Sequence, residues 1–375
     1  MNPGDLEADP SALVEDGPGG GAETAAGDGA LGRAMTDSAT PLAPDLEADS
    51  LRAGSALEDA PSRTSVLAWF RVVGGAVVFA LALRVLAFEA YRIPSTSMED
   101  TLLVGDFVLV SKLHYGARVL GRRAPGATEP QRGDVVVFNY PPSLDPDVTR
   151  RIPYIKRVVG TPGDTLSIRG KTVQVGANAQ SSPPSGRSLW SVRGRLPRAD
   201  ALDSLGLTRR LRRVDDGAWI ASATSRQAQA LAGSGDLEVA PYVRPAGDGS
   251  AAFPSARRYS LDDYGPVVVP AKGQTVVLDD ASWSLVRTAI ERFEGHTVER
   301  TAMGFLIDGR PAETYTFTQD YYFVMGDSRD DSADSRTWGF VPFDHVIGKA
   351  VVVYFSWDDD SERPRWDRVG SGMDE

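Results

Sequence analysis

The chain has 375 residues, a formal net charge of -11 and no cysteine, which excludes disulfides, thiol catalysis and cysteine-based zinc sites. Residues 1–60 hold 13 acidic residues against two arginines and carry the whole excess charge, so an overall basic face for nucleic acid is not supported. The three histidines are widely spaced and form no HExxH pair, so we expect no metal site and no cofactor.

The first segment, residues 1–62, is rich in Gly, Ala, Pro, Ser, Asp and Glu. A chain of this composition buries too little apolar surface to offset the entropy that ordering costs. The sequence therefore predicts a disordered acidic tail.

The next segment, residues 63–90, is predominantly apolar, and Val66–Phe88 alone has 23 residues. As a helix this stretch would measure about 34 Å, enough for a hydrocarbon core of about 30 Å, and Arg71 and Arg84 lie near its ends. The sequence predicts one transmembrane helix. The alternative is a long buried helix of a soluble domain; a cleaved signal peptide fits less well because about 60 residues precede the segment.

Beyond Tyr91, short runs rich in Val, Tyr, Phe and Thr alternate with turn residues. This pattern predicts a mainly β fold, with an antiparallel β domain in two parts, residues 91–171 and 314–358. The clearest expected strands are Phe107–Val110, Asp134–Phe138, Thr165–Ile168, Thr314–Thr318, Tyr321–Met325 and Val346–Phe355.

Between the two parts we expect an inserted α+β subdomain at residues 172–313, with a helix at Ser282–Phe293. It contains a group of four arginines, which forms either a solvated face or an anion site: Arg209, Arg210, Arg212 and Arg213. Residues 359–375 are expected to form a flexible C-terminal tail.

Three segments carry residues that could perform chemistry: Arg92–Leu102, Tyr154–Thr165 and Met325–Pro342. Each also has a simple structural interpretation, because Ser and Thr cap helices, Gly-Asp pairs form turns and charged stretches are usually exposed. A serine nucleophile would need a neighbouring base. A Ser-His-Asp triad remains open, although no GxSxG motif is present.

Lysine is the other candidate base, and the chain has only five lysines among its 40 basic residues. Arginine cannot serve because it stays protonated. Lys156 lies in the apolar stretch Tyr-Ile-Lys-Arg-Val-Val, where burial would lower its pKa toward neutrality. A strand lysine that points to solvent is the alternative.

In this order, and after an apolar segment, the three segments resemble the type I signal peptidase family. The matching motifs are Pro-Ser-x-Ser-Met…Thr-Leu at 94–102, Tyr-Ile-Lys-Arg-Val-Val-Gly at 154–160 and Gly-Asp-x-Arg-Asp-x-Ser-x-Asp-Ser-Arg at 326–336. The resemblance implies a β-rich serine endopeptidase with a Ser/Lys dyad. Such an enzyme removes N-terminal signal peptides from exported preproteins.

The resemblance assigns roles to residues of this chain. Ser97 would be the nucleophile, and Lys156 the general base that takes its proton and returns it to the leaving amine. Ser95 and the backbone N–H of Ser97 would form the oxyanion hole, and Ser332 would hydrogen-bond and orient the lysine. The residues that would brace the site are Asp327, Arg329, Asp334 and Arg336. The apolar lining, which would favour Ala-x-Ala sites, is Tyr91, Ile93, Pro94, Met98, Leu102, Val137 and Ile155.

The chain departs from the family pattern at three positions. Asp100 stands where the motif usually has proline, and Ser328 and Asp331 replace the more usual asparagines.

The same resemblance implies a single-pass protein of the cytoplasmic (inner) membrane, with its tail in the cytoplasm and its β domain on the extracytoplasmic side. Its partners would be signal peptides, the lipid bilayer and the secretion translocon. Two alternatives stay open. One is a soluble, self-cleaving Ser/Lys regulator, and the other is a catalytically inactive, membrane-tethered binding or scaffold protein.

Overall fold

The computed structural model describes residues 63–116, 118–119, 122–123, 128–180, 186–244, 252–302 and 304–373. The tail expected at residues 1–62 lies outside them. The chain divides into a unit that ends at Ala76 and a unit that begins at Val77.

Helix α1 (Arg63–Leu86) occupies most of the predicted apolar segment. It ends at Leu86 rather than at 90, because β1 (Phe88–Arg92) begins two residues later and pairs with β2 (Asp106–Ser111). The described side chains of α1 are exposed, Val72 to 72%. Within the part of the chain that the structure describes, no helix is long and apolar enough to cross a membrane.

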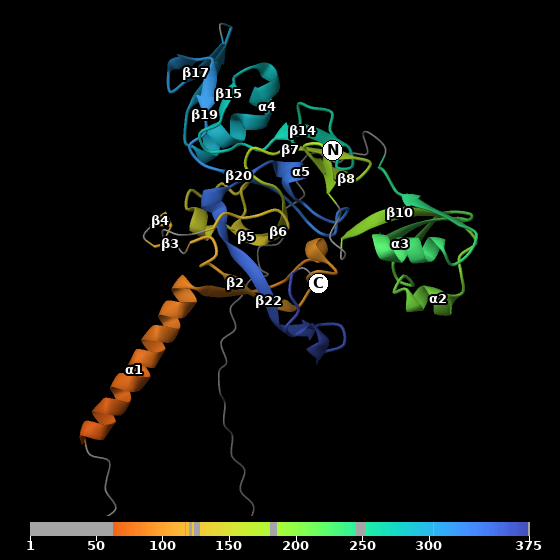
Figure 1. Ribbon diagram of the computed structural model, residues 1–375, viewed down its shortest axis with the longest axis horizontal. Coiled ribbons are helices and arrows are strands. Elements are labelled where there is room, and N and C mark those ends of the chain that lie inside the picture. The colour runs from red at the N-terminus through yellow and green to blue at the C-terminus, as the bar shows by residue number, and fades with distance from the viewer. Residues whose placement is uncertain are drawn as a thin grey trace, which may run out of the picture. The chain divides into compact units, whose positions relative to one another are not determined.

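One antiparallel sheet forms the centre of the second unit, as Figure 1 shows. Long strand β22 crosses its middle and pairs with β2 on one side and β5 on the other. The mainly β, antiparallel architecture predicted from the sequence is confirmed. The strands follow the order β1, β2, β22 (Val346–Asp358), β5 (Val135–Asn139), β6 (Pro153–Gly160), β20 (Tyr321–Met325) and β21 (Val341–Pro342), and β23 (Arg363–Pro364) pairs with β22.

At β5 the sheet is buried on both faces, and the sequence of this strand shows why. Val135 and Val137 belong to one apolar cluster, whereas Val136 and Phe138 belong to another. Successive side chains of a strand point to opposite faces, so a continuous run of apolar residues suits a strand covered on both sides.

A second layer of small elements packs against β20 and shares one core. Leu166, Tyr264, Ile290 and Phe323 all lie in it, each fully buried. Its elements are β7 (Thr165–Arg169), β8 (Thr172–Val175), β9 (Asn178–Gln180), β14 (Tyr264–Val268), β15 (Thr275–Val277), α4 (Asp280–Thr288) with the π-helical turn Ala289–Phe293, β16 (Val298–Thr301), β17 (Gly304–Ile307), β18 (Arg310–Ala312) and β19 (Thr314–Thr316).

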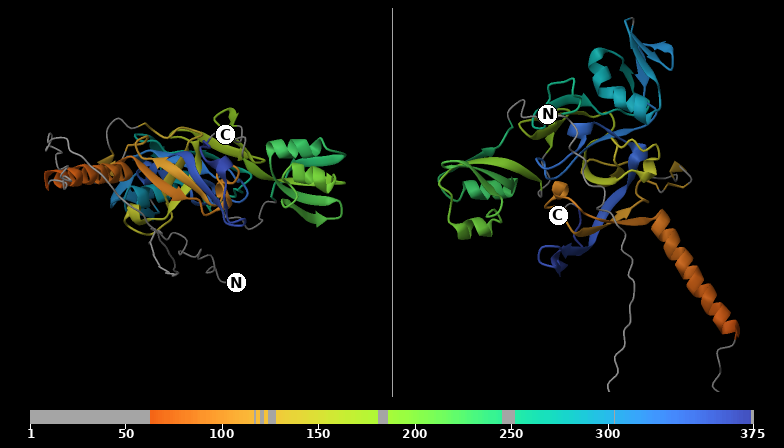
Figure 2. Two further views of the ribbon diagram at one scale, coloured as in Figure 1. Left: turned by 90° about the horizontal axis from the view of Figure 1, so that it is seen from below. Right: turned by 180° about the vertical axis from the view of Figure 1, so that it is seen from behind.

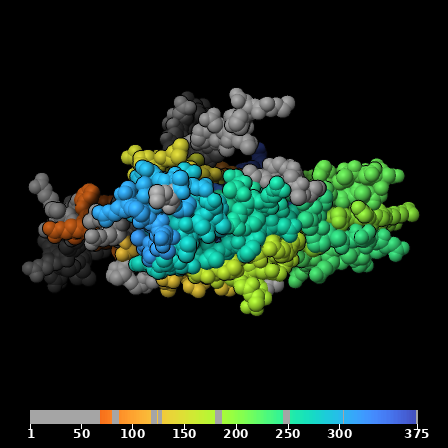
Figure 3. Space-filling model, turned by 90° about the horizontal axis from the view of Figure 1, so that it is seen from above, coloured from red at the N-terminus to blue at the C-terminus, as the bar shows by residue number. Residues whose placement is uncertain are grey.

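The predicted insertion at residues 172–313 is therefore too wide. Only residues 187–241 form a sheet with a core of its own, in the strand order β11, β12, β10, β13. Figure 2 shows this sheet in green as a separate group in both views, and in Figure 3 it borders the teal residues that follow it. Its elements are β10 (Arg187–Gly194), α2 (Ala199–Ser204), β11 (Leu211–Asp215), β12 (Ala218–Thr224), α3 (Ser225–Ala232) and β13 (Leu237–Pro241).

The flexible tail predicted at residues 359–375 is wrong for residues 359–373. Arg368 donates to the buried carboxylate of Asp106 at 2.6 Å, and Met373 packs in the same cluster as Met98. A buried carboxylate needs charged or hydrogen-bonding partners, and this segment supplies them. The remaining short elements are β3 (Arg118–Val119), β4 (Arg122–Arg123), α5 (Ser335–Trp338) and the 3-10 turns η1 (Thr96–Met98), η2 (Val148–Arg150), η4 (Phe343–His345) and η5 (Trp366–Arg368).

The close approach of β22 to β2 requires glycine at position 348. A Cβ at Gly348 would lie 2.5 Å from the carbonyl oxygen of Ser111, so Gly348→Ala must push the two strands apart. We expect it to lower the free energy of unfolding by about 1–3 kcal/mol in urea denaturation. Gly235→Ala, where no atom lies within 4 Å of the new Cβ, is the control. Equal stability of the two variants would contradict the prediction.

Candidate active site

Ser97 lies in the short turn η1, in the loop that connects β1 to β2. The loop is anchored by Met98 and Leu102, whose side chains are fully buried, and Leu102 N–H donates to the Met98 carbonyl at 2.7 Å. Ser97 itself is 9% exposed. The two buried residues Met98 and Leu102, which follow Ser97 in sequence, therefore hold the position of its hydroxyl.

Lys156 lies on β6 and reaches the hydroxyl of Ser97 from a position 59 residues away in sequence. Its Nζ is 2.7 Å from Ser97 Oγ and 2.8 Å from the carbonyl oxygen of Ile155. The side chain is buried, and this burial lowers the pKa of Lys156 to about 8, against the opposing effect of Asp334 and Asp327. A buried amine whose pKa lies close to neutral pH can accept a proton from the serine hydroxyl.

No histidine takes this place in the described part of the chain. The hydrogen-bond partners of Ser97 Oγ there are Lys156 and Ser95. His296 is bonded to Asp308, and His345 to Asp344 and Arg151. The geometry thus favours the lysine over the Ser-His-Asp alternative.

Ser95 lies beside Ser97, with its Oγ 3.3 Å from Ser97 Oγ. Its side chain is exposed, so a carbonyl placed against Ser97 could also meet the Ser95 hydroxyl. The structure therefore brings together three of the predicted site residues, Ser95, Ser97 and Lys156.

Ser332 is close to Ser97 but does not make the predicted hydrogen bond to Lys156. Its Oγ is buried and has no hydrogen-bond partner within the described residues. It faces Gly326, where an added Cβ would lie 2.3 Å from Ser332 Oγ and 2.5 Å from the carbonyl oxygen of Ser97. Lys156 donates instead to Ser97 and Ile155, which explains why the expected contact with Ser332 is not formed.

Asp327 connects the three segments of the site. Its carboxylate accepts from Arg157 of β6, at 2.9 Å from Nε and 2.8 Å from Nη2, and from the Thr101 hydroxyl at 2.7 Å. Asp327 is fully buried and Arg157 is 7% exposed. A buried bidentate pair of this kind fixes both backbones, because separating it would leave an uncompensated charge.

Asp334 and Arg336 form a second buried pair, with Nε to Oδ1 at 2.9 Å and Nη2 to Oδ2 at 2.8 Å. Asp334 also accepts from the Gly326 N–H at 3.1 Å. Burial alone would raise the pKa of Asp334, but Arg336 and the backbone donors lower it below its usual value. Arg329, the fourth predicted brace, is buried, and its N–H donates to the Arg187 carbonyl at 2.8 Å.

Most of the predicted apolar lining gathers in one cluster beneath Ser97. Ile93, Met98, Leu102 and Val137 are buried in it, with Tyr91 and Ile155 packed at its edge. Pro94 is exposed and is not part of this cluster.

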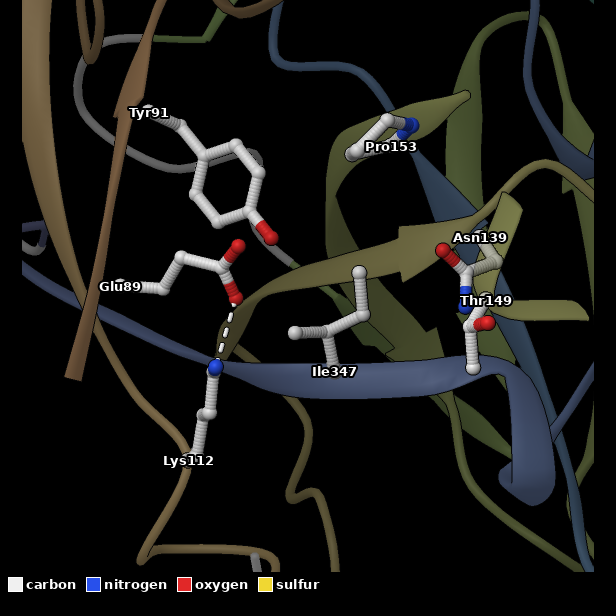
Figure 4. Close-up of a pocket in the computed structure, with 7 residues that line it drawn as sticks. All are labelled: Glu89, Tyr91, Lys112, Asn139, Thr149, Pro153 and Ile347. Atoms are coloured by element: carbon white, nitrogen blue, oxygen red, sulfur yellow. Dashed lines mark ion pairs between the residues drawn. The ribbon is translucent and has the colours of Figure 1, made fainter. Parts of the chain in front are cut away.

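Tyr91 also lines a cavity of about 320 Å³ that lies between β1 and β6. Figure 4 shows Glu89 and Tyr91 on one side of it, Pro153 and Asn139 on the other, and Ile347 of β22 between them. Glu89 pairs with Lys112 at 2.8 Å in its wall. Tyr91 and Ile347 also pack against the apolar cluster, so the cavity adjoins it. Pro153 of its lining belongs to β6, the strand that carries Lys156.

Sequence reasoning missed the roles of Arg157, Thr101 and Arg187 in this site. Arg157 belongs to the second motif and pairs with Asp327 of the third. A buried carboxylate needs a cationic or hydrogen-bonding partner, so the aspartate of the third motif was the available signal for Arg157. Arg187 contacts Asp100 from a distant strand, and no motif marks it.

A sequence model of the family described as "Signal peptidase, peptidase S26" matches residues 66–195 and 269–357, more than half of the chain. The chain belongs to the signal peptidase family. The 187–241 sheet lies largely in the gap between the two matched ranges.

Individual signal peptidases are similar in sequence to this chain over most of their length. Signal peptidase I of Pseudomonas aeruginosa is 29% identical over 77% of this chain and 73% of its own. Signal peptidase I of Aquifex aeolicus is 27% identical over 75% of this chain and 80% of its own. The Rickettsia typhi enzyme of the same name is 23% identical over 76% and 80%, respectively.

The lowered pKa of Lys156 predicts how peptidase activity depends on pH. A general base must be neutral, so we expect kcat/KM to rise about tenfold per pH unit below pH 8 and to level off above it. Peptide cleavage between pH 6 and 9.5 measures the profile. Lys272→Arg, a change at an exposed lysine, should leave it unchanged. A profile that is flat across this range would contradict the assignment.

Proposed function

We propose that this peptidase removes N-terminal signal peptides from exported preproteins with Ser97 as nucleophile and Lys156 as general base. The observation that carries the proposal is the buried contact of 2.7 Å between Lys156 Nζ and Ser97 Oγ. It occurs in a chain of the signal peptidase family, at residues that match the family's motifs. A silent scaffold would have no need of a buried lysine against a serine, since burying an amine costs stability.

The chemistry follows from the positions of these groups. Neutral Lys156 takes the proton of Ser97 as Oγ attacks the scissile carbonyl carbon. The oxyanion that forms would be met by the Ser95 hydroxyl and the Ser97 N–H. When the tetrahedral intermediate collapses, the C–N bond breaks and the lysine ammonium protonates the leaving amine. Lys156 then accepts a proton from water, which hydrolyses the acyl-enzyme and restores the serine.

The preprotein would bind as an extended strand. Residues 153–156 of β6 pair with β5, whereas β20 pairs with β6 only from Arg157 onward, so one edge of this stretch has no strand partner in the described sheet. An exposed strand edge can accept an added peptide strand. The apolar cluster at Ile93 and Ile155 would then take small side chains at positions -1 and -3, which favours Ala-x-Ala sites.

The remaining predicted residues would support this site. Asp327 and Asp334 hold Arg157 and Arg336 in buried pairs around the dyad. Ser332 would orient Lys156, since its buried hydroxyl has unused hydrogen-bonding capacity beside the nucleophile.

We further propose that α1 anchors the peptidase in the inner membrane, with residues 1–62 in the cytoplasm and the β domain on the extracytoplasmic side. The 24 residues of α1 correspond to about 36 Å of helix. Its described apolar side chains, such as Trp69, Phe70 and Val78, are more than half exposed. An exposed apolar surface of this kind needs a lipid or protein partner. An anchor beside the secretion translocon would bring Ser97 to its substrates.

The dyad predicts the effect of two substitutions. Ser97→Ala and Lys156→Met should each lower the cleavage rate of a preprotein with an Ala-x-Ala site at least about 10³-fold. The full chain in detergent is incubated with the preprotein, and the new N-terminus is sequenced. Ser284→Ala on α4 is the matched serine control and should cleave normally. Retained cleavage by Ser97→Ala would exclude this nucleophile, and an inactive wild type would favour the scaffold alternative.

The anchor predicts how the protein fractionates. The full chain should stay with membranes during extraction in alkaline carbonate, which strips peripheral proteins, whereas a variant that lacks residues 1–86 should be released. Release of the full chain would contradict the anchor without affecting the proposed dyad.

A further inference from the structure

The loop that carries Ser97 has an unusual backbone conformation at Asp100, two residues after the turn η1 ends. Its φ is +78°, in the left-handed region. Proline, the residue usual in the family motif at this position, is confined to φ near -65° and could not adopt this conformation. The change from proline to Asp100 therefore goes with a different backbone conformation, which proline could not adopt. Some other contact must hold that path.

The contact comes from the 187–241 sheet. Arg187, the first residue of β10, places Nη2 2.7 Å from Asp100 Oδ1 and 2.5 Å from Oδ2. Its other terminal nitrogen donates to the Ser222 carbonyl of β12 at 2.7 Å, so the guanidinium is fixed by its own sheet. Arg187 is 2% exposed. Next to it, Arg210 pairs with Glu99 at 2.9 Å.

A chain of backbone hydrogen bonds runs parallel to this ion pair. Arg187 N–H donates to the Asp327 carbonyl at 2.9 Å, and Ser328 N–H donates to the Ser97 carbonyl at 3.1 Å. From the same segment as Ser328, Asp331 accepts a hydrogen bond from the Thr96 hydroxyl at 2.5 Å. The residues at which the chain departs from the family pattern, Asp100, Ser328 and Asp331, thus all contact the nucleophile loop or the strand end that holds it.

We propose that Arg187 is a positioning residue for the nucleophile: through Asp100 it holds the loop so that Ser97 Oγ stays within reach of Lys156. The 187–241 sheet is then part of the catalytic apparatus, although it contributes no group to the reaction. The inference rests on the proposed role of Ser97.

A purely structural ion pair would give a different result. Such a pair would change stability but leave the turnover of folded enzyme intact. A positioning pair instead changes kcat, because a misplaced nucleophile slows the chemical step. It should leave KM nearly unchanged, because Ile155 and the strand edge proposed to bind substrate lie on β6, outside the nucleophile loop.

The test compares Asp100→Asn, Arg187→Met and the double variant in the full chain in detergent. Asn tolerates positive φ, so Asp100→Asn removes the charge without straining the backbone. Each single variant should lower kcat at least 10-fold with KM within 3-fold. The double variant should be no slower than the slower single variant, because both remove the same contact. Arg187→Lys should recover part of the loss. Arg213→Gln, which breaks the exposed pair with Asp216 on the same sheet, is the control.

A second readout does not depend on activity. Hydrogen exchange of residues 95–103, followed by mass spectrometry, should be at least 10-fold faster in Arg187→Met than in wild type, and unchanged in Arg213→Gln. If wild type cleaves no preprotein, the proposed function fails while the exchange result still tests the restraint. A kcat within 2-fold of wild type in a folded Asp100→Asn, or multiplicative losses in the double variant, would overturn the inference.

Discussion

The contact between Lys156 Nζ and Ser97 Oγ depends on support from the rest of the molecule. It joins a loop to a strand 59 residues away, and it requires an amine to be buried. Neither requirement is met locally. The loop is held from below by Met98 and Leu102 in the apolar cluster, and from the third segment by the Ser328 N–H to the Ser97 carbonyl. The strand is held by its place between β5 and β20.

The proposed mechanism requires Lys156 to lose its proton, and the carboxylates near it are themselves paired with arginines. Asp327 and Asp334 both lie near enough to raise the pKa of Lys156. Each is engaged by an arginine, Arg157 and Arg336 respectively, in a buried bidentate pair. An ion pair presents less field to a third charge than a lone carboxylate does, so burial remains the larger effect on the lysine. The two aspartates can therefore hold the backbone in place without keeping Lys156 protonated.

Sequence reasoning succeeded where one short stretch carries the whole signal. The β runs predicted the strands β2, β5, β7, β20 and β22, since apolar and β-branched residues identify a strand without reference to its neighbours. It failed where a partner lies far along the chain. The segment at 359–373 looks polar because its arginines serve a carboxylate on β2, and Arg187 looks ordinary because its partner is Asp100. The predicted insertion included strands such as β14 and β8, which pair with β7 of the preceding part. Composition does not show which strands pair with one another, so the sequence could not reveal this.

The place of β22 in the central sheet has a consequence for biosynthesis. β22 separates β2 from β5, so within the central sheet the strand that follows Ser97 and the strand that precedes Lys156 pair with each other only through residues 346–358. A ribosome delivers those residues long after Ser97 and Lys156. During synthesis, the loop with Ser97 and the strand with Lys156 would therefore lack β22 between their neighbouring strands until most of the chain has been made. The central sheet, and with it the contact between Ser97 and Lys156, would be completed only late in folding.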